Sequence, residues 1–318
     1  MNRKVLLLSP IDPAGMELLH EGGCKIIQSH AEDEAERVRE MAAYDPAAII
    51  TRTDLPVTAA LMAAAPSLKV VSRHGVGVDN IDIAEASRRS IRVTHVIDGN
   101  YLSVAEHAVF LMLACARQYG MIRDALETDD FSVRSRLMGM ELRGKTVGLI
   151  GTGHIGKALA GLARAFGMTV TGYSRHAAPG TVSGEGIHFL AGRDEVLRSA
   201  DFVVLCLPAT AETIHSIGER ELHLMKQSAF LINVARGSIV VEAALIQALQ
   251  DGAIAGAGLD VFDPEPPDGR NPLFHMENVI ATPHSAALTR EALVKLACRA
   301  AEQVVQVLDG KEPEFPVN

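Results

Sequence analysis

Three side chains in the C-terminal half of the chain, Arg236, Glu265 and His284, follow predicted strands and are suited to moving a proton or binding an anion. Histidine side chains titrate near neutrality, at about pH 6.5, so His284 can donate a proton and take it back. A carboxylate at Glu265 would hold the ring in one tautomer and favour its imidazolium form. The planar guanidinium of Arg236 matches a carboxylate or the paired oxygens of an oxo acid. Taken singly, each residue also has a structural explanation. His284 could cap the next helix, Glu265 could be a solvated loop carboxylate, and Arg236 could bind a backbone carbonyl and so hold a loop.

A glycine pattern in the middle of the chain predicts a dinucleotide-binding site. Gly151, Gly153 and Gly156 form G-x-G-x-x-G directly after an apolar strand pattern at 147–150. This spacing permits a tight turn, a close approach of backbone to a pyrophosphate and close packing of the next helix, whose N-terminal N–H groups favour an anion. An Ala-rich helix and a second strand near 168–173 complete a βαβ unit. We therefore predict a dinucleotide site rather than a structural glycine-rich turn.

The end of that second strand indicates which dinucleotide binds. An acidic residue that holds the adenosine ribose is expected about twenty positions after the glycines. The sequence there reads Tyr173-Ser174-Arg175-His176, without a carboxylate. Arginine can pair with a 2′-phosphate, and no negative charge repels that phosphate. We therefore predict NADP(H) as the cofactor, with NAD(H) as the alternative if Arg175 stacks on the adenine or lies in solvent.

The composition limits the classes of partner. A length of 318 residues predicts about two domains, and a hydrophobic share of 48% is ample for their cores. The net charge of −9 gives no reason to expect nucleic acid or an acidic membrane as partner. The apolar runs are too short for a membrane span or a signal peptide. Four widely separated cysteines form no metal or redox spacing, so we expect a soluble cytoplasmic protein with free thiols and no metal site.

The elements that must position these residues alternate between strand and helix. In the first hundred residues, strands are predicted at 5–8, 25–29, 47–51 and 70–72, and helices near 14–21, 33–41 and 59–64. From residue 145 onward, strands are predicted at 147–150, 170–173, 202–206, 230–233, 256–259 and 279–281, and helices near 157–166, 193–199, 219–224 and 242–250. Such alternation is typical of parallel sheets with helices on both faces, here two doubly wound α/β domains.

Two further helices connect these domains. An apolar helix at 103–119 opens with Ser103-Val104-Ala105-Glu106, a capping-box pattern, and is predicted to link the domains. A last helix at 289–308 is not needed by the second sheet, so we expect it to return to the first domain. The predicted domains are therefore residues 1–100 with 288–318, and residues 101–287. The short remainder of the chain predicts no C-terminal regulatory domain.

In their order and spacing, the glycine loop, Arg236, Glu265 and His284 resemble the D-isomer-specific 2-hydroxyacid dehydrogenase family, and the resemblance covers essentially the whole chain. It implies a Rossmann cofactor domain inserted in a flavodoxin-like substrate domain, with the reaction in the cleft between them. The implied reaction is the nicotinamide-dependent reduction of a 2-oxo acid, or its reverse, on a substrate of the glyoxylate, hydroxypyruvate or 3-phosphoglycerate type. Arg236, Glu265 and His284 would be catalytic. Glu265 implies the hydroxyacid branch, because the formate-oxidising branch has an amide there.

The resemblance also implies binding residues. The segment from Arg73 to Asp82 resembles the family's substrate loop, in which Gly75, Val76 and Gly77 would form a nest of N–H groups around the substrate carboxylate. His74 either contacts substrate or lies beside the loop, and Arg52 would approach the same pocket. Asp54, close to Arg52, disfavours a substrate with a phosphate arm. The implied cofactor contacts, besides the glycines, Ser174 and Arg175, are His154, Ile155, Pro208, Val234, Ala235 and Asp260, the last accepting a hydrogen bond from the nicotinamide amide.

Other functions and assemblies stay open from sequence alone. Some relatives of this family act as NAD(H)-sensing modules that bind proteins and keep the same catalytic residues. A third hypothesis is that the protein oxidises an unusual sulfur- or phosphorus-containing acid on the same scaffold. The apolar residues 109–113 lie on more than the one helix face that packing against a sheet requires, which predicts a homodimer across this helix. The alternative is that this helix is buried between the two domains of one chain.

Overall fold

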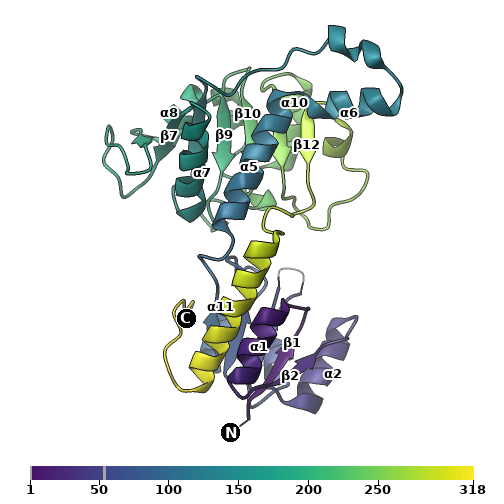
Figure 1. The fold of residues 1–318 in the computed structure, drawn as a ribbon, viewed down its shortest axis with the longest axis vertical. Coiled ribbons are helices and arrows are strands. Elements are labelled where there is room, and N and C mark those ends of the chain that lie inside the picture. The colour runs from purple at the N-terminus through teal and green to yellow at the C-terminus, as the bar shows by residue number, and fades with distance from the viewer. Residues whose placement is uncertain (1, 53–54) are drawn as a thin grey trace. The chain divides into compact units, whose positions relative to one another are not determined.

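The computed structural model describes residues 2–52 and 55–318, so Asp54 lies outside the described residues. The chain forms two compact units. Unit 1 is Met1–Asn100 with Leu288–Asn318, and unit 2 is Tyr101–Ala287. Each unit contains one parallel β-sheet with helices on both faces, so the predicted class of two doubly wound α/β sheets is confirmed (Figure 1).

Unit 1 contains a five-stranded sheet in the order β2-β1-β3-β4-β5. Its strands are β1 (Lys4–Leu7), β2 (Lys25–Gln28), β3 (Ala48–Thr51), β4 (Val70–Arg73) and β5 (Arg92–Thr94), and its helices are α1 (Pro13–Glu21), α2 (Glu34–Tyr44), α3 (Ala59–Ala63), α4 (Ile83–Arg88) and α11 (Arg290–Leu308). This is the flavodoxin-like strand order, which places the crevice for a ligand outside the carboxyl ends of β1 and β3.

Apolar residues cover both faces of the unit 1 sheet. On one face Val5, Leu7 and Ile50 pack with α1 and α11, which lie side by side (Figure 1). The two helices approach so closely that a Cβ on Gly15 would lie 2.7 Å from the backbone of Ala297. The opposite face buries Leu6 and other apolar residues against α2, α3 and α4. The last helix of the chain thus completes the core of the unit formed by the first hundred residues.

Unit 2 contains a seven-stranded sheet in the order β12-β11-β10-β9-β6-β7-β8. Its strands are β6 (Thr146–Ile150), β7 (Thr169–Tyr173), β8 (Ile187–Phe189), β9 (Phe202–Leu205), β10 (Phe230–Asn233), β11 (Gly256–Leu259) and β12 (Val279–Ala281). The helices α5 (Tyr101–Ala116) and α7 (His154–Ala165) pack on one face, where Figure 1 shows them in front of the strands. The helices α8 (Arg193–Ser199), α9 (Glu219–Leu224) and α10 (Glu242–Gln250) pack on the other face. The remaining elements are α6 (Tyr119–Glu127) and the 3₁₀ turns η1 (Phe131–Ser135), η2 (Gly237–Ile239) and η3 (Pro272–His275).

The apolar helix predicted at 103–119 differs at both ends. α5 begins at Tyr101, so Ser103 lies buried inside the helix and cannot serve as its N-cap. α5 ends at Ala116 because Gln118 adopts a left-handed backbone (φ 53°), after which α6 starts in a new direction. Among the described residues, no helix is both long and apolar enough to cross a membrane.

Candidate active site

The glycine loop of unit 2 joins β6 to α7 and requires glycine for two different reasons. Gly151 has a positive φ of 111°, and a Cβ there would lie 2.4 Å from the carbonyl oxygen of Cys206. A Cβ on Gly156 would lie 2.4 Å from the oxygen of Gly151. A Cβ on Gly153, by contrast, would meet nothing within 4 Å. Packing inside the protein therefore does not explain Gly153, whereas the close approach of a pyrophosphate does.

The position of this loop in the sheet also fits a dinucleotide. Strand β6 lies between β7 and β9 in the sheet. From β6 the chain first adds β7 and β8 on one side, and then returns to add β9 to β12 on the other side, so the strand order switches between β6 and β9. Ligands of doubly wound sheets bind outside the carboxyl ends of strands at such a point. α7 begins at His154 without a side-chain cap, which leaves its N-terminal N–H groups open to a phosphate. Pro208 is exposed just beyond β9, and the buried Val234 and Ala235 follow β10 at the same edge.

Ser174 and Arg175 follow β7 at the carboxyl edge of the sheet, next to the glycine loop after β6. The Arg175 guanidinium pairs with Glu212 at 3.0 Å, and their side chains are 71% and 72% exposed. An ion pair exposed to this degree contributes little to stability. Arg175 is therefore able to leave Glu212 for a phosphate at low cost.

His284 and Glu265 form a hydrogen-bonded pair in unit 2, with 2.7 Å between His284 Nδ1 and Glu265 Oε2. The other carboxylate oxygen accepts the Phe262 N–H at 3.0 Å. Burial raises the pKa of Glu265, but the bonds from His284 and Phe262 and the charge of Arg236 outweigh it, so that pKa lies below its ordinary value. Because an ionised carboxylate only accepts, the hydrogen lies on Nδ1, and Nε2 is the ring nitrogen left for proton transfer.

The turn that carries His284 is held by Asp260, at the end of β11. His284 has a left-handed backbone (φ 51°), and its N–H donates to the Asp260 carbonyl at 2.8 Å. The Asp260 side chain is 1% exposed. Its Oδ1 accepts from the Ser285 N–H at 2.8 Å and from the Thr282 hydroxyl at 2.6 Å, while its Oδ2 accepts from the Ala286 N–H at 2.9 Å. Asp260 thus holds the N–H groups of His284 and the two residues after it, together with the Thr282 side chain before it. Its contact with a nicotinamide amide stays a prediction.

Asp260 remains ionised in this setting. Burial raises the pKa of the carboxyl, but the hydrogen bonds from His107, Thr282 and the two N–H groups outweigh burial and lower that pKa below its ordinary value. His107 comes from α5, and its Nε2 lies 2.9 Å from the Thr282 hydroxyl and 3.4 Å from Asp260 Oδ1. Sequence reasoning missed His107. The available signal was a polar residue within an apolar helix, where an unpaired side chain would be costly.

Arg236 lies after β10 in the same unit. Its Nη1 donates to the Ala235 carbonyl at 2.7 Å, and the Asn233 side chain holds the Arg236 carbonyl at 3.0 Å. A Cβ on the next residue, Gly237, would lie 2.0 Å from the Phe262 carbonyl carbon, so the Arg236 loop packs directly on the segment that leads to Glu265. The charge of Arg236 also lowers the pKa of Glu265, so the structure places Arg236 near the pair of Glu265 and His284.

The segment 73–77 of unit 1 is built to present N–H groups. The buried Arg73 donates from Nε to the Gly77 carbonyl at 2.7 Å and from Nη1 to the His74 carbonyl at 3.0 Å. The Gly75 carbonyl accepts the Val96 N–H at 2.8 Å. Within residues 2–52 and 55–318, the N–H groups of Val76 and Gly77 have no acceptor in the protein. Two neighbouring free donors on a held backbone suit an anion such as a carboxylate.

The two basic side chains beside this segment differ in availability. His74 is 5% exposed, and burial, aided by the charges of Arg52 and Arg73, lowers its pKa to about 4. His74 is therefore neutral at physiological pH and offers a substrate no charge. Arg52 follows β3 at the crevice of the unit 1 sheet, where its Nη1 lies 3.4 Å from the Pro10 carbonyl. Among the described residues, no cluster of His, Cys, Asp and Glu could hold a metal, and all four cysteines are free.

Known proteins resemble this chain in both sequence and fold. The family model described as D-isomer specific 2-hydroxyacid dehydrogenase, NAD binding domain, matches residues 109–286. The chain is 38% identical over 315 residues to a D-3-phosphoglycerate dehydrogenase of Archaeoglobus fulgidus, covering 99% of this chain and 59% of that protein. It is 36% identical over 312 residues to a glyoxylate reductase of Thermococcus onnurineus, covering 94% of this chain and 93% of that protein.

A solved structure shares the whole fold. The NADPH-dependent glyoxylate/hydroxypyruvate reductase of Sinorhizobium meliloti, in complex with NADP and malonate, matches with a TM-score of 0.86 and 31% identity, covering 100% of this chain and 97% of that one. The chain thus spans 59% of the phosphoglycerate dehydrogenase but nearly all of both reductases. These similarities confirm the resemblance that the sequence motifs carry.

Replacement of Asp260 tests its role in the turn. In Asp260→Asn one oxygen becomes an NH₂ group that cannot accept an N–H, so we expect the free energy of unfolding to fall by about 1–3 kcal/mol at pH 7. The Asp260 pKa is lowered by folding, so the carboxylate stabilises the fold fully above its ordinary pKa of 3.8, and this stabilisation is lost as pH falls through the lower folded value.

Chemical denaturation of both proteins between pH 7 and pH 3 measures this effect. The difference between wild type and Asp260→Asn should be constant down to about pH 5 and shrink below about pH 4. Asp124→Asn, on the exposed surface of α6, is the control and should follow the wild-type curve. A difference that persists unchanged at pH 3 would contradict the assignment.

Proposed function

Because the chain belongs to the D-isomer specific 2-hydroxyacid dehydrogenase family, we propose that it transfers a hydride between a nicotinamide cofactor and a small 2-oxo acid or D-2-hydroxy acid. The observation that carries this proposal is the 2.7 Å pair of His284 and Glu265, which belongs to the same unit as the glycine loop. A proton donor with its tautomer fixed and a nucleotide loop are the two requirements of such a reaction.

In the proposed reduction each residue has a separate task. The hydride comes from the bound nicotinamide cofactor and returns to it in the reverse reaction. His284 donates the proton from Nε2 to the alkoxide oxygen, and the ionised Glu265 stabilises the imidazolium before transfer. Arg236 offers the cation that binds the substrate and polarises its carbonyl. In oxidation of the hydroxy acid, neutral His284 removes the hydroxyl proton instead.

The substrate class is proposed from the shape of its anion. The N–H groups of Val76 and Gly77 would bind one carboxylate, with Arg52 adding positive charge near the mouth of the site and His74 supporting the segment. The names of the relatives point to substrates of the glyoxylate, hydroxypyruvate or phosphoglycerate type. The reductases match this chain along nearly their whole length, which supports glyoxylate or hydroxypyruvate as the substrate rather than phosphoglycerate.

Loss of the His284 imidazole should stop turnover but spare the cofactor. In His284→Ala we expect kcat with glyoxylate or hydroxypyruvate to fall about 10²- to 10⁴-fold, because the proton donor is lost. The dissociation constant for NADPH or NADH, measured by fluorescence titration, should change less than about twofold. The control is His188→Ala, an exposed histidine of β8 in the same unit. Undiminished turnover in His284→Ala would remove this residue from the mechanism.

For the cofactor we propose NADP(H), with NAD(H) as the second candidate. The end of β7 presents Ser174 and Arg175 in place of a ribose-binding carboxylate. The partner of Arg175, Glu212, is exposed and readily exchanged for a phosphate. The similar reductase of Sinorhizobium meliloti is described as NADPH-dependent.

Initial rates with NADPH and NADH test this preference. We expect wild type to favour NADPH, and Arg175→Ala to lower kcat/KM for NADPH roughly tenfold while leaving NADH nearly unchanged, because only NADPH carries the 2′-phosphate. Arg198→Ala, an exposed arginine of α8, is the matched control. A wild type that prefers NADH would overturn the cofactor proposal and leave the reaction standing.

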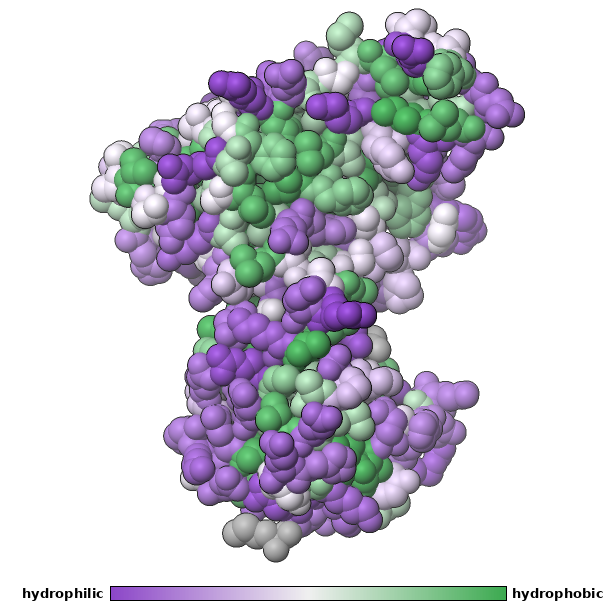
Figure 2. Space-filling view, in the orientation of Figure 1, coloured by the Kyte–Doolittle hydropathy of each residue, from purple (hydrophilic) through white to green (hydrophobic). Residues whose placement is uncertain are grey.

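We further propose that two copies of this chain form a homodimer through unit 2. Large apolar side chains stay exposed on and after α5 and α6: Leu102 (57%), Phe110 (47%), Tyr119 (52%), Leu126 (56%), Phe131 (67%) and Met138 (84%). Figure 2 shows such hydrophobic residues gathered over α5 and α6. An apolar patch of this kind is typical of an interface.

A charge placed in this patch should separate the copies. Light scattering after size exclusion should give a dimer for wild type and a monomer for Phe131→Glu, because burying a carboxylate in an apolar interface is costly. Val182→Glu, at another exposed apolar residue (54%) outside the patch, should remain dimeric. A monomeric wild type at micromolar concentration would reject the proposal.

A further inference from the structure

We propose that the C-terminal segment, residues 312–318, positions the substrate loop, residues 73–77, through Gln303 and His95. This inference rests on the proposed function, in which the N–H groups of Val76 and Gly77 bind the substrate carboxylate. All the residues that carry it belong to unit 1.

The direction of each free N–H is set by the carbonyl before it. A trans peptide is planar, so the C=O of one residue and the N–H of the next point in opposite directions within one rigid plane. The Gly75 carbonyl accepts from Val96, at 2.8 Å, which fixes the Val76 N–H. The Val76 carbonyl lies 2.9 Å from His95 Nδ1. A carbonyl only accepts, so the His95 ring donates, and this single bond fixes the Gly77 N–H.

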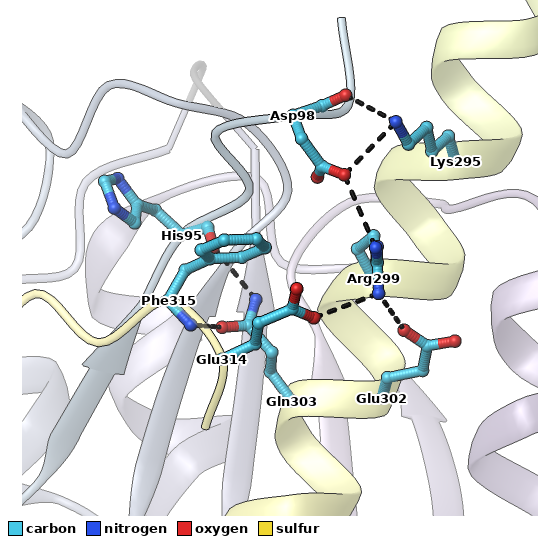
Figure 3. A network of polar contacts seen from close by, with 8 residues as sticks. All are labelled: His95, Asp98, Lys295, Arg299, Glu302, Gln303, Glu314 and Phe315. Atoms are coloured by element: carbon cyan, nitrogen blue, oxygen red, sulfur yellow. Dashed lines mark hydrogen bonds and ion pairs between the residues drawn. The ribbon is translucent and has the colours of Figure 1, made fainter. Parts of the chain in front are cut away.

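His95 is in turn held by both of its backbone groups. Its carbonyl accepts from the Gln303 Nε2 at 2.9 Å, and its N–H donates to the Phe315 carbonyl at 3.2 Å. Gln303 is 2% exposed, and its Oε1 accepts the Phe315 N–H at 3.0 Å. Figure 3 shows the Gln303 side chain from α11 between His95 and Phe315. One buried amide therefore joins the C-terminal segment to the residue that aims the loop.

The rest of the C-terminal segment is attached along β5, the edge strand of the sheet. Val317 donates to the Val93 carbonyl at 2.8 Å, and the Asn318 side chain accepts the Val93 N–H at 2.8 Å. The segment runs antiparallel to β5, with Pro316 opposite Thr94. Because these bonds precede His95 directly in the chain, they fix the register at which His95 reaches the loop.

Two basic residues of α11, Lys295 and Arg299, form ion pairs with residues on both sides of the contact between His95 and the C-terminal segment. The Arg299 guanidinium lies 3.0 Å from Glu314 in the C-terminal segment and 3.4 Å from Asp98, three residues after His95. Lys295 pairs with the same Asp98 at 3.2 Å (Figure 3). Each partly exposed pair contributes little alone, but together they tie Glu314 and Asp98 to one helix. The segment is therefore docked by backbone, amide and charge at once.

Four variants separate positioning from simple loss of structure. His95→Leu removes the donor to Val76, whereas His95→Asn keeps a side-chain N–H near the position of Nδ1. Gln303→Leu removes the link between His95 and Phe315. Gln306→Leu, about one turn further along α11, is the matched control because the hydrogen bonds to His95 and Phe315 come from Gln303, whereas the buried Gln306 Oε1 has no partner among the described residues. Full-length protein is used in every case.

The first measurement is steady-state kinetics with glyoxylate or hydroxypyruvate at saturating cofactor. We expect His95→Leu and Gln303→Leu to raise KM for the acid about five- to tenfold, the usual effect of losing one hydrogen bond, with kcat changed less than twofold. His95→Asn should restore most of the wild-type KM, and the affinity for NADPH should not change. An unaltered KM in His95→Leu, or an equal rise in Gln306→Leu, would overturn the inference.

Hydrogen exchange gives a result that does not depend on turnover. In Gln303→Leu, peptides that contain the His95 and Val96 amides should exchange faster than in wild type, while the segment around the glycine loop of unit 2 stays unchanged. Unchanged exchange at Val96 would reject the positioning role even if the enzyme is active. Faster exchange in a protein that turns over no 2-oxo acid would instead reject the proposed function and leave the coupling established.

Discussion

The candidate catalytic turn depends on one buried carboxylate. Asp260 directly follows β11, and its side chain accepts bonds from Thr282, Ser285 and Ala286 while its carbonyl accepts the His284 N–H. A left-handed backbone at a non-glycine residue costs free energy, and these bonds keep His284 in that conformation. Without them the ring would have no fixed direction, and the hydrogen bond to Glu265 would define a tautomer but not a position.

The anion sites that we propose in the two units consist of backbone N–H groups rather than of exposed basic side chains. In unit 2 the uncapped start of α7 follows a loop in which Gly153 leaves room for a ligand. In unit 1 the carbonyls of the substrate loop are occupied from behind, which turns the N–H groups of Val76 and Gly77 outward. Such donors cost little to reorganise because planar peptides and the surrounding hydrogen bonds already hold them. A net charge of −9 is therefore no obstacle to binding anions.

Local patterns predicted most strands and helices of the fold. The helices Arg193–Ser199, Glu219–Leu224 and Glu242–Gln250 have the predicted bounds. The predictions omitted β5, β8 and α4, whose three to six residues are too short to show a helical or strand period, and also the nine-residue α6. The prediction that Ser103 begins this helix was wrong, because Ser103 lies buried inside α5. The same capping-box pattern can occur within helices as well as at their ends.

The sequence by itself determined the chemistry that is available: the glycine loop, the proposed proton donor His284, the carboxylate Glu265 and the missing acidic residue at Arg175. These features depend on residue type and on short spacings, which can be recognised in the sequence without knowledge of the fold. The roles of His107, His95 and Gln303 were decided by the tertiary structure alone. His107 is 175 residues from Thr282 and Gln303 is 208 residues from His95, so no local pattern can relate them. Only packing of α5 and α11 on their sheets brings such groups within hydrogen-bonding distance, where buried polar atoms must find partners.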